Sequence, residues 1–148
     1  MYMSTTINSQ DGTMTGEAKG FATLFEQFRF IIPEYQREFE WEKEKIITFI
    51  DDIFEELDNG RQYFFGPIVL LNPEHGQDQE LIDGQQRLTS FSVLIGLLAD
   101  IIYEKSVATS DQILKVVSEG IRSKIAIQNS GNWSTKITPH QDSKIFYK

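Results

Sequence analysis

The order of apolar and polar positions along the chain predicts two amphipathic helices before residue 60. Residues 42–58 carry apolar side chains at helical spacing, and Asn59-Gly60 supplies a stop signal. The apolar positions of this helix are Ile46, Phe49, Ile50, Ile53 and Leu57, widened by Ile47 and Phe54. A shorter helix is expected over residues 20–28, followed by a brief strand at 29–32.

The next stretch indicates a β-hairpin that leads into a long helix. Residues 62–71 predict a strand pair or one bent strand, with a bulge, bend or edge at Gly66-Pro67. Residues 72–79 predict a polar loop that contains His75. Glu80 to Ile82 returns as a second strand. The helix expected over 85–104 is apolar nearly all round, which is typical of a central, buried helix.

The two ends of the chain are less regular. Residues 1–19 are polar and predict a flexible arm, whereas residues 20–148 are expected to form one domain. After residue 104, Thr109 or Ser110 is expected to cap another helix, with Gln112 as the partner of Thr109. An extended segment at 136–139 precedes a helix start at His140, so we expect an N-terminal fragment of a longer protein.

Composition narrows the functional classes. The chain has 148 residues and no Cys, which excludes disulfides, a thiolate nucleophile and a Cys-type zinc site. No apolar run is long enough to cross a membrane, and no secretory signal is visible, so a cytoplasmic protein without membrane contact is expected.

Charge is unevenly distributed. The net charge is −8, and residues 34–58 hold ten acids against three bases. Residues 104–148 hold seven bases against four acids, so this part can still face nucleic acid. Because an acidic protein repels the phosphate backbone, nonspecific DNA binding by this chain alone is not expected.

The main candidate for chemistry is Asp83-Gly84-Gln85-Gln86-Arg87, between the second strand of the hairpin and the long helix. Gly84 permits a sharp turn, and the first turn of a helix offers unpaired N–H groups to an anion. Arg87 is a fork donor for phosphate, and the two Gln side chains both donate and accept. Asp83 can hold a metal-bound water, accept from a ribose hydroxyl or cap the helix. The structural alternative has Asp83 as cap, both Gln side chains solvated and Arg87 paired with an acid.

A second segment, residues 33–41, is dense in aromatic and polar groups. Tyr35 and Trp41 can stack on a base, and Gln36-Arg37 repeats the Gln-Arg pair of the first motif. Two such pairs can hold one anionic ligand from two sides. Alternatively, Tyr35, Phe39 and Trp41 lock the loop to the core and Arg37 pairs with a nearby acid.

Together these segments resemble the DGQQR-domain family, the N-terminal half of GmrSD-type modification-dependent restriction enzymes, whose relatives include SspE-type defence proteins. Ile32 to Trp41 is similar to the family's Ile-Pro-x-Tyr-Gln-Arg-x-aromatic-x-Trp segment, and Asp51-Asp52-Ile53 to its Asp-Asp-Ile helix. Tyr63 to Leu70 resembles the family's Gly-containing strand, with Pro67 where a small residue is usual. Leu81 to Thr89 matches the family signature throughout.

The resemblance implies an α/β fold of ParB/sulfiredoxin type, with a small sheet and packed helices. It also implies NTP binding and hydrolysis without a P-loop, in a regulatory domain for restriction or phage defence. Asp83, Gln86 and Arg87 are the expected catalytic residues. Nucleotide is expected to contact Gly84, Gln85, Arg87, Tyr35, Gln36 and Arg37, with Asp83 as the ligand of Mg²⁺.

The resemblance further implies a C-terminal HNH-type nuclease region or partner, and DNA reached through the full-length protein. His75 and His140 have no spacing that fits such a nuclease, so DNA cleavage is not expected in this chain. Two other functions remain open. One is a DNA-sensing module with a vestigial nucleotide site, and the other is a domain that docks a nuclease partner without turnover of its own.

Overall fold

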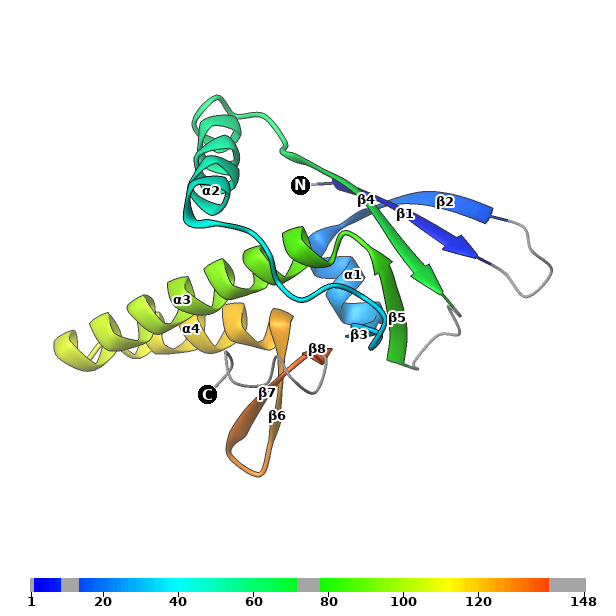
Figure 1. Cartoon of the computed structure of the whole chain (residues 1–148). Coiled ribbons are helices and arrows are strands. Elements are labelled where there is room, and N and C mark those ends of the chain that lie inside the picture. The colour runs from blue at the N-terminus through cyan, green and yellow to red at the C-terminus, as the bar shows by residue number, and fades with distance from the viewer. Residues whose placement is uncertain (1, 9–13, 72–77, 139–148) are drawn as a thin grey trace.

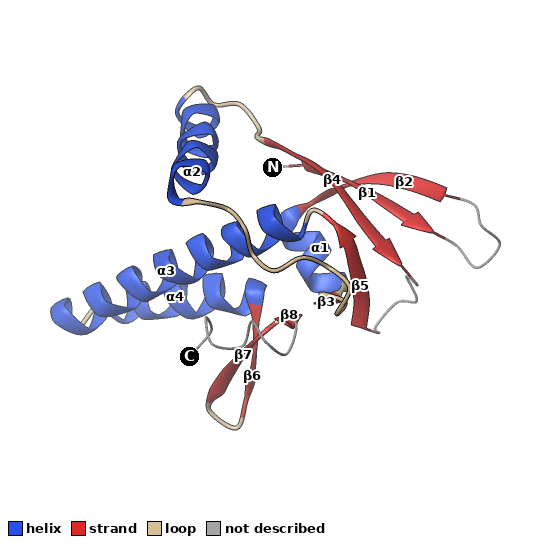
Figure 2. Cartoon of the chain, in the orientation of Figure 1, coloured by secondary structure: helices blue, strands red, loops and turns tan. Residues whose placement is uncertain are grey.

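A computed structural model describes residues 2–8, 14–71 and 78–138, and these form a mixed α/β fold, as expected. Helices gather on one side of a mixed sheet, and α3 and α4 extend away from it side by side (Figures 1 and 2). The helices are α1 (Phe21–Gln27), α2 (Lys43–Asp58), α3 (Gln85–Thr109) and α4 (Gln112–Ile125). The strands are β1 (Tyr2–Asn8), β2 (Met14–Gly20), β3 (Arg29–Ile31), β4 (Phe64–Leu71), β5 (Asp78–Asp83), β6 (Ala126–Asn129), β7 (Asn132–Thr135) and β8 (Ile137–Thr138).

The main sheet has the strand order β2-β1-β4-β5-β3-β8. β4 and β5 pair antiparallel, which confirms the predicted hairpin, while β5 pairs parallel with β3. β6 and β7 form a separate antiparallel pair. The carboxyl end of β5 therefore lies within the sheet, between two neighbouring strands, where it delivers the chain into α3.

The flexible arm expected over residues 1–19 is wrong for the described part of that segment. β1 pairs parallel with β4 over Tyr2 to Asn8, and β2 pairs antiparallel with β1. Composition pointed to disorder because the segment is polar, but β4 has a second edge whose backbone groups need partners. The strand β1 supplies those hydrogen bonds without needing apolar side chains.

The core is aromatic and connects the sheet to the helices. Phe65 of β4 lies at its centre, with ring centroids 5.5 Å from Phe91 of α3 and 5.7 Å from Phe49 of α2. Phe25 of α1 is also buried and stacks on Phe21 at 4.4 Å. Edge-to-face and stacked ring pairs of this kind stabilise a core beyond area burial alone. They fix β4 relative to the beginning of α3.

The expectation that α3 is buried along its whole length is wrong. Its first part is buried around Leu88 and Phe91, but Leu97 and Ile101 are 55% and 61% exposed. The helix also runs on to Thr109. Beyond the sheet α3 has mainly α4 to cover it (Figure 1), so an all-round apolar pattern is only partly buried there.

The cap of α4 lies one or two residues later than expected. Asp111 is the cap, and its Oδ1 accepts from the backbone N–H of Ile113 at 2.8 Å and of Leu114 at 3.2 Å. Thr109 belongs to α3 and donates its hydroxyl to the carbonyl of Lys105. Ser110 has a φ of 53°, and this left-handed residue ends α3. Of the two residues that were expected to cap α4, Thr109 therefore belongs to α3 and Ser110 to the interhelical turn.

Replacement of Asp111 by alanine is expected to lower the free energy of unfolding by about 1 kcal/mol, because two first-turn N–H groups lose their acceptor. Thr109→Ala is the matched control, since its hydroxyl bonds within α3 and caps nothing. Urea unfolding followed by circular dichroism measures both variants. A larger loss for Thr109→Ala than for Asp111→Ala would contradict the assignment.

Two further expectations lie partly outside the described residues. The loop with His75 and the segment from Pro139 onward, with His140, fall at 72–77 and 139–148. Within the described ranges, no helix combines the length and the apolar character needed to cross a membrane.

Candidate functional site

The candidate site lies where β5 meets α3, in the predicted strand–turn–helix. Gly84 has a φ of 90°, and a Cβ there would approach Ile68 Cγ1 to 3.0 Å and the carbonyl oxygen of Pro67 to 3.3 Å. Both conditions favour glycine. Gly84 rather than Asp83 is the N-cap, and no side chain of the described residues caps α3. The structural alternative of Asp83 as helix cap is therefore wrong, and the first-turn N–H groups stay available to a ligand.

The two glutamines are partly buried and bind the loop backbone, whereas the structural alternative had both of them solvated. Gln85 donates its Nε2 to the carbonyl oxygen of Arg37 at 2.7 Å. Gln86 donates its Nε2 to the carbonyl oxygen of Glu38 and accepts from the N–H of Glu40, both at 3.0 Å. The beginning of α3 is thereby joined to the loop that holds the second motif.

The second motif contributes some of its residues to the site. Gln36 donates its Nε2 to the carbonyl oxygen of Ile82 at 3.0 Å, next to Asp83. Trp41 packs against Phe49 with ring centroids 5.2 Å apart. Tyr35, in contrast, is 69% exposed and does not line the pocket described below. Of the aromatic side chains of this loop, Trp41 is the one that anchors it to the core.

Arg87 binds the backbone of β4. Its Nη1 donates to the carbonyl oxygen of Phe65 and its Nη2 to that of Pro67, both at 2.8 Å. The carboxylate of Asp83 lies 3.7 Å from Nη2. Gly66, between the two acceptors, has a φ of 86°, and a Cβ there would lie 1.9 Å from Nη1. Gly66-Pro67 had signalled a bulge, but nothing in the sequence connected it to Arg87.

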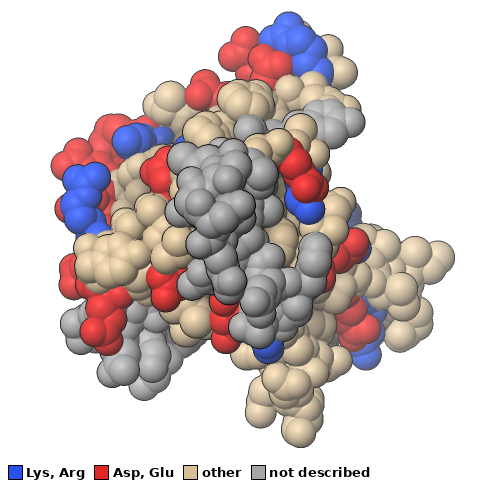
Figure 3. Space-filling model, turned by 90° about the vertical axis from the view of Figure 1, so that its right-hand side faces the viewer, with Lys and Arg blue, Asp and Glu red and all other residues tan. Residues whose placement is uncertain are grey.

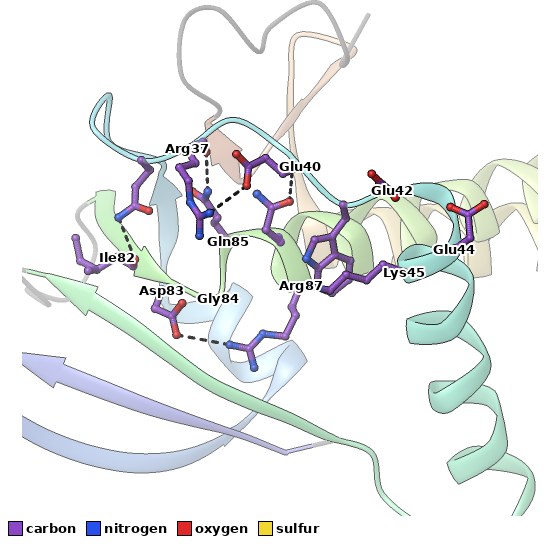
Figure 4. A pocket seen from close by; sticks show the side chains of 13 residues that line it. Arg37, Glu40, Glu42, Glu44, Lys45, Ile82, Asp83, Gly84, Gln85 and Arg87 are labelled. Carbon is purple, nitrogen blue, oxygen red and sulfur yellow. Dashed lines mark hydrogen bonds and ion pairs between the residues drawn. The ribbon is translucent and has the colours of Figure 1, made fainter.

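These segments enclose a pocket of about 600 Å³ (Figure 4). Seven of the eight expected site residues line it, and Tyr35 is the exception. The lining residues are Gln36, Arg37, Glu40, Trp41, Glu42, Glu44, Lys45, Ile82, Asp83, Gly84, Gln85, Gln86 and Arg87. The two motifs, about 46 residues apart in the chain, therefore share one cavity, as the repeated Gln-Arg pair had suggested.

The wall contributed by α2 was missed from the sequence. Lys45 lies in the first turn of α2, with its Nζ 5.0 Å from the centre of the Trp41 ring. Its position four residues after Trp41 was the available signal. Arg37 is 82% exposed and pairs with Glu40 at 3.2 Å. The lining holds three cationic and four anionic side chains, so both signs of charge face the cavity.

The side chains that could hold the expected Mg²⁺ are carboxylates. The described residues contain no cluster of three or more His, Cys, Asp or Glu side chains arranged to hold a metal ion. Mg²⁺ is commonly held by one or two carboxylates together with water and substrate phosphates. Asp83, with a side chain that is 64% exposed at the rim of the pocket, fits this kind of site.

The comparison with known proteins identifies the family. No curated protein matches the chain. The family model described as the N-terminal domain of GmrSD restriction endonuclease matches residues 21–147, which include the β5–α3 turn, the 33–41 loop and helices α1 to α4. The expected class of a restriction or defence module is thereby supported. The chain belongs to the family of GmrSD restriction endonuclease N-terminal domains.

Proposed function

We propose that this domain binds and hydrolyses an NTP with Mg²⁺, and that it regulates the nuclease part of a restriction or defence protein. The observation that carries the proposal is the pocket itself. The two family motifs and the beginning of α2 surround one cavity at the uncapped N-terminus of α3. A cavity of about 600 Å³ is of the size that holds a small organic ligand.

The polar groups of the pocket suit a nucleotide. The first-turn N–H groups of α3 and the positive end of its dipole favour a phosphate. Arg37 and Lys45 supply mobile cationic groups, whereas Arg87 uses donors of both terminal nitrogens on β4. Trp41 offers an aromatic surface to a base. The phosphate contact expected of Arg87 is therefore assigned also to the first-turn N–H groups of α3 and to Lys45.

Metal dependence follows from the charges. With four acidic side chains around three basic ones, a polyphosphate without a counter-ion meets no net attraction from the lining. Bound Mg²⁺ supplies the missing positive charge. Asp83 holds its water shell or orients the attacking water, and Gln86 acts as a positioning group.

The proposal is tested by isothermal titration of the chain with each of the four NTPs and Mg²⁺, with phosphate release measured in parallel. Lys45→Ala is expected to weaken binding about tenfold, a loss of about 1.4 kcal/mol. Lys43→Ala is the matched control, because Lys43 begins the same helix but does not line the pocket. Absence of saturable binding by the folded chain, or equal effects of the two substitutions, contradicts the proposal.

The charges and apolar side chains on the surface help to compare two alternative functions, DNA binding and docking of a nuclease partner. On the face shown in Figure 3, the Lys and Arg side chains of the described residues are interspersed with Asp and Glu, which gives little support to DNA binding there. Docking has one observation in its favour, since Ile113 and Val116 of α4 are 75% and 68% exposed. Partner binding that survives Asp83→Ala and Lys45→Ala is the signature of that role.

A further inference from the structure

We propose that Gln85 and Gln86 form a latch that holds the 33–41 loop over the pocket, and that they act on nucleotide through this loop. The two residues are then positioning residues and not groups that contact the reacting phosphates. The link to nucleotide rests on the function proposed above, while the latch itself is a property of the free protein.

The hydrogen bonds that define the latch join segments 46 to 48 residues apart. Gln85 holds the carbonyl of Arg37, and Gln86 holds both the carbonyl of Glu38 and the N–H of Glu40. Three backbone groups of the loop, at Arg37, Glu38 and Glu40, are thus tied to the first turn of α3. Figure 4 shows the bond of Gln85 to Arg37 and, below it in this view, the Asp83–Arg87 pair.

Gln86 is the specific element of the latch because it uses both ends of its amide. Its nitrogen can only donate and its oxygen can only accept, so a carbonyl and an N–H two residues apart fix the orientation of the side chain. No shorter residue reaches both groups from the same Cα, and a carboxylate satisfies only the N–H. The pair of bonds therefore accounts for an amide of this length at this position.

The loop has few other restraints. Residues 32–42 contain no helix or strand, and a backbone bond from Gln36 N–H to the carbonyl of Pro33 forms a single turn. Gln36 ties the first part to β5, and Trp41 packs the end against α2. Between these two anchors, the bonds of Gln85 and Gln86 tie the loop backbone to α3.

The consequence concerns the pocket wall. Arg37 and Trp41 both line the cavity, and the bonds of the latch fall on Arg37 and on residues between the two. A loop that is ordered before the ligand arrives lowers the conformational cost of binding. Gln86 therefore contributes to affinity by keeping Arg37 and Trp41 in place.

The latch is tested without nucleotide by amide hydrogen exchange of the folded chain. The amide of Glu40 is in an exposed loop and is protected through its bond to Gln86 Oε1. Gln86→Met is expected to speed its exchange at least about tenfold, the effect of losing a bond of about 1.4 kcal/mol. Gln85→Met and the surface control Gln112→Met are expected to leave this amide protected.

A second variant separates the latch from a folding defect. Gln86→Glu keeps an acceptor for the Glu40 amide but cannot donate to the carbonyl of Glu38, so protection at Glu40 persists while the loop as a whole exchanges faster. Protection of the amide of Ala99, a fully buried residue in the middle of α3, shows that each variant is folded. An unprotected Glu40 amide in the wild-type chain, or unchanged protection in Gln86→Met, overturns the latch.

The kinetic arm distinguishes positioning from contact with the reacting groups. Gln86→Met is expected to raise KM for Mg²⁺-NTP about tenfold with kcat within a factor of about two, and Gln86→Glu to recover part of the KM. A large fall in kcat at unchanged KM overturns the positioning role. If the wild-type chain turns over no nucleotide, the proposed function fails, and the exchange of the Glu40 amide still decides whether the latch exists.

Discussion

Gly66→Ala is expected to lower the free energy of unfolding by about 4 kcal/mol, as the sum of a strained backbone and a displaced arginine. The φ of 86° costs an L-residue about 1 kcal/mol. The larger part arises because a Cβ at this position lies 1.9 Å from Arg87 Nη1. The guanidinium must move, and its bonds to the carbonyl oxygens of Phe65 and Pro67 are lost.

Gly131 provides the matched control for this prediction. Its φ is 87°, close to that of Gly66, but no atom lies within 4 Å of the position of its Cβ. Gly131→Ala is therefore expected to cost only about 1 kcal/mol of strain. Denaturant unfolding of both variants isolates the contact with Arg87 as the difference. Equal losses at the two positions contradict the interpretation.

A double-mutant cycle tests the same contact from the other side. Arg87→Met removes the bonds to β4 by itself, so adding Gly66→Ala to it is expected to cost little beyond the strain. The combined loss should fall short of the sum of the single losses by about 3 kcal/mol, the part of the Gly66→Ala loss that comes from the hydrogen bonds of Arg87. Full additivity within experimental error would show that Gly66 and Arg87 act independently.

Lys136→Met is expected to destabilise the fold by about 3 kcal/mol, because three carbonyl oxygens lose one charged donor. Lys136 Nζ donates to the carbonyl of Phe25 at 3.0 Å, of Ser123 at 3.0 Å and of Lys124 at 3.1 Å. These acceptors lie near the carboxyl ends of α1 and α4, where the helix dipole favours a cation. Burial partly desolvates the ammonium group and lowers the pKa of Lys136. The three carbonyl oxygens stabilise the charged form of this group.

The control for Lys136 is Lys115→Met on the exposed surface of α4. Lys115 is exposed, and its substitution is expected to change the free energy of unfolding by less than about 0.5 kcal/mol. Thermal and urea unfolding compare the two variants at neutral pH. A Lys136→Met variant as stable as Lys115→Met would show that the three bonds contribute no net stability.

The contacts of Arg87 change how substitutions in the motif are to be interpreted. Because its guanidinium supports β4, a loss of activity in Arg87→Ala combines a disturbed strand with any lost phosphate contact. Lys45 and Arg37 separate the two effects better, since they line the pocket from α2 and from the loop. Arg87 is thus a structural residue whatever its role toward a ligand. Ligand binding is therefore better tested by substituting Lys45 and Arg37.

The sequence by itself determined the elements whose pattern is local. Helical spacing predicted α1 and α2, and Asn59-Gly60 marked the end of α2, where Gly60 has a φ of 65°. Glycine between a strand and a helix predicted the turn at Gly84. The repeated Gln-Arg pair suggested that the two motifs hold one ligand from two sides, and in the structure both motifs line one cavity. The predictions of helices and turns depend on residues within a few positions of one another, where periodicity and backbone preference decide the conformation.

Only the tertiary structure decided the contacts between distant residues. Pairing of β1 with β4, insertion of Arg87 against Gly66, and the bonds of Gln86 to Glu38 and Glu40 all join segments from about 20 to more than 60 residues apart. A polar side chain or an open strand edge has many acceptable partners in the sequence. Packing of the aromatic core places β4, α2 and the beginning of α3 together, and backbone groups within reach then become the partners.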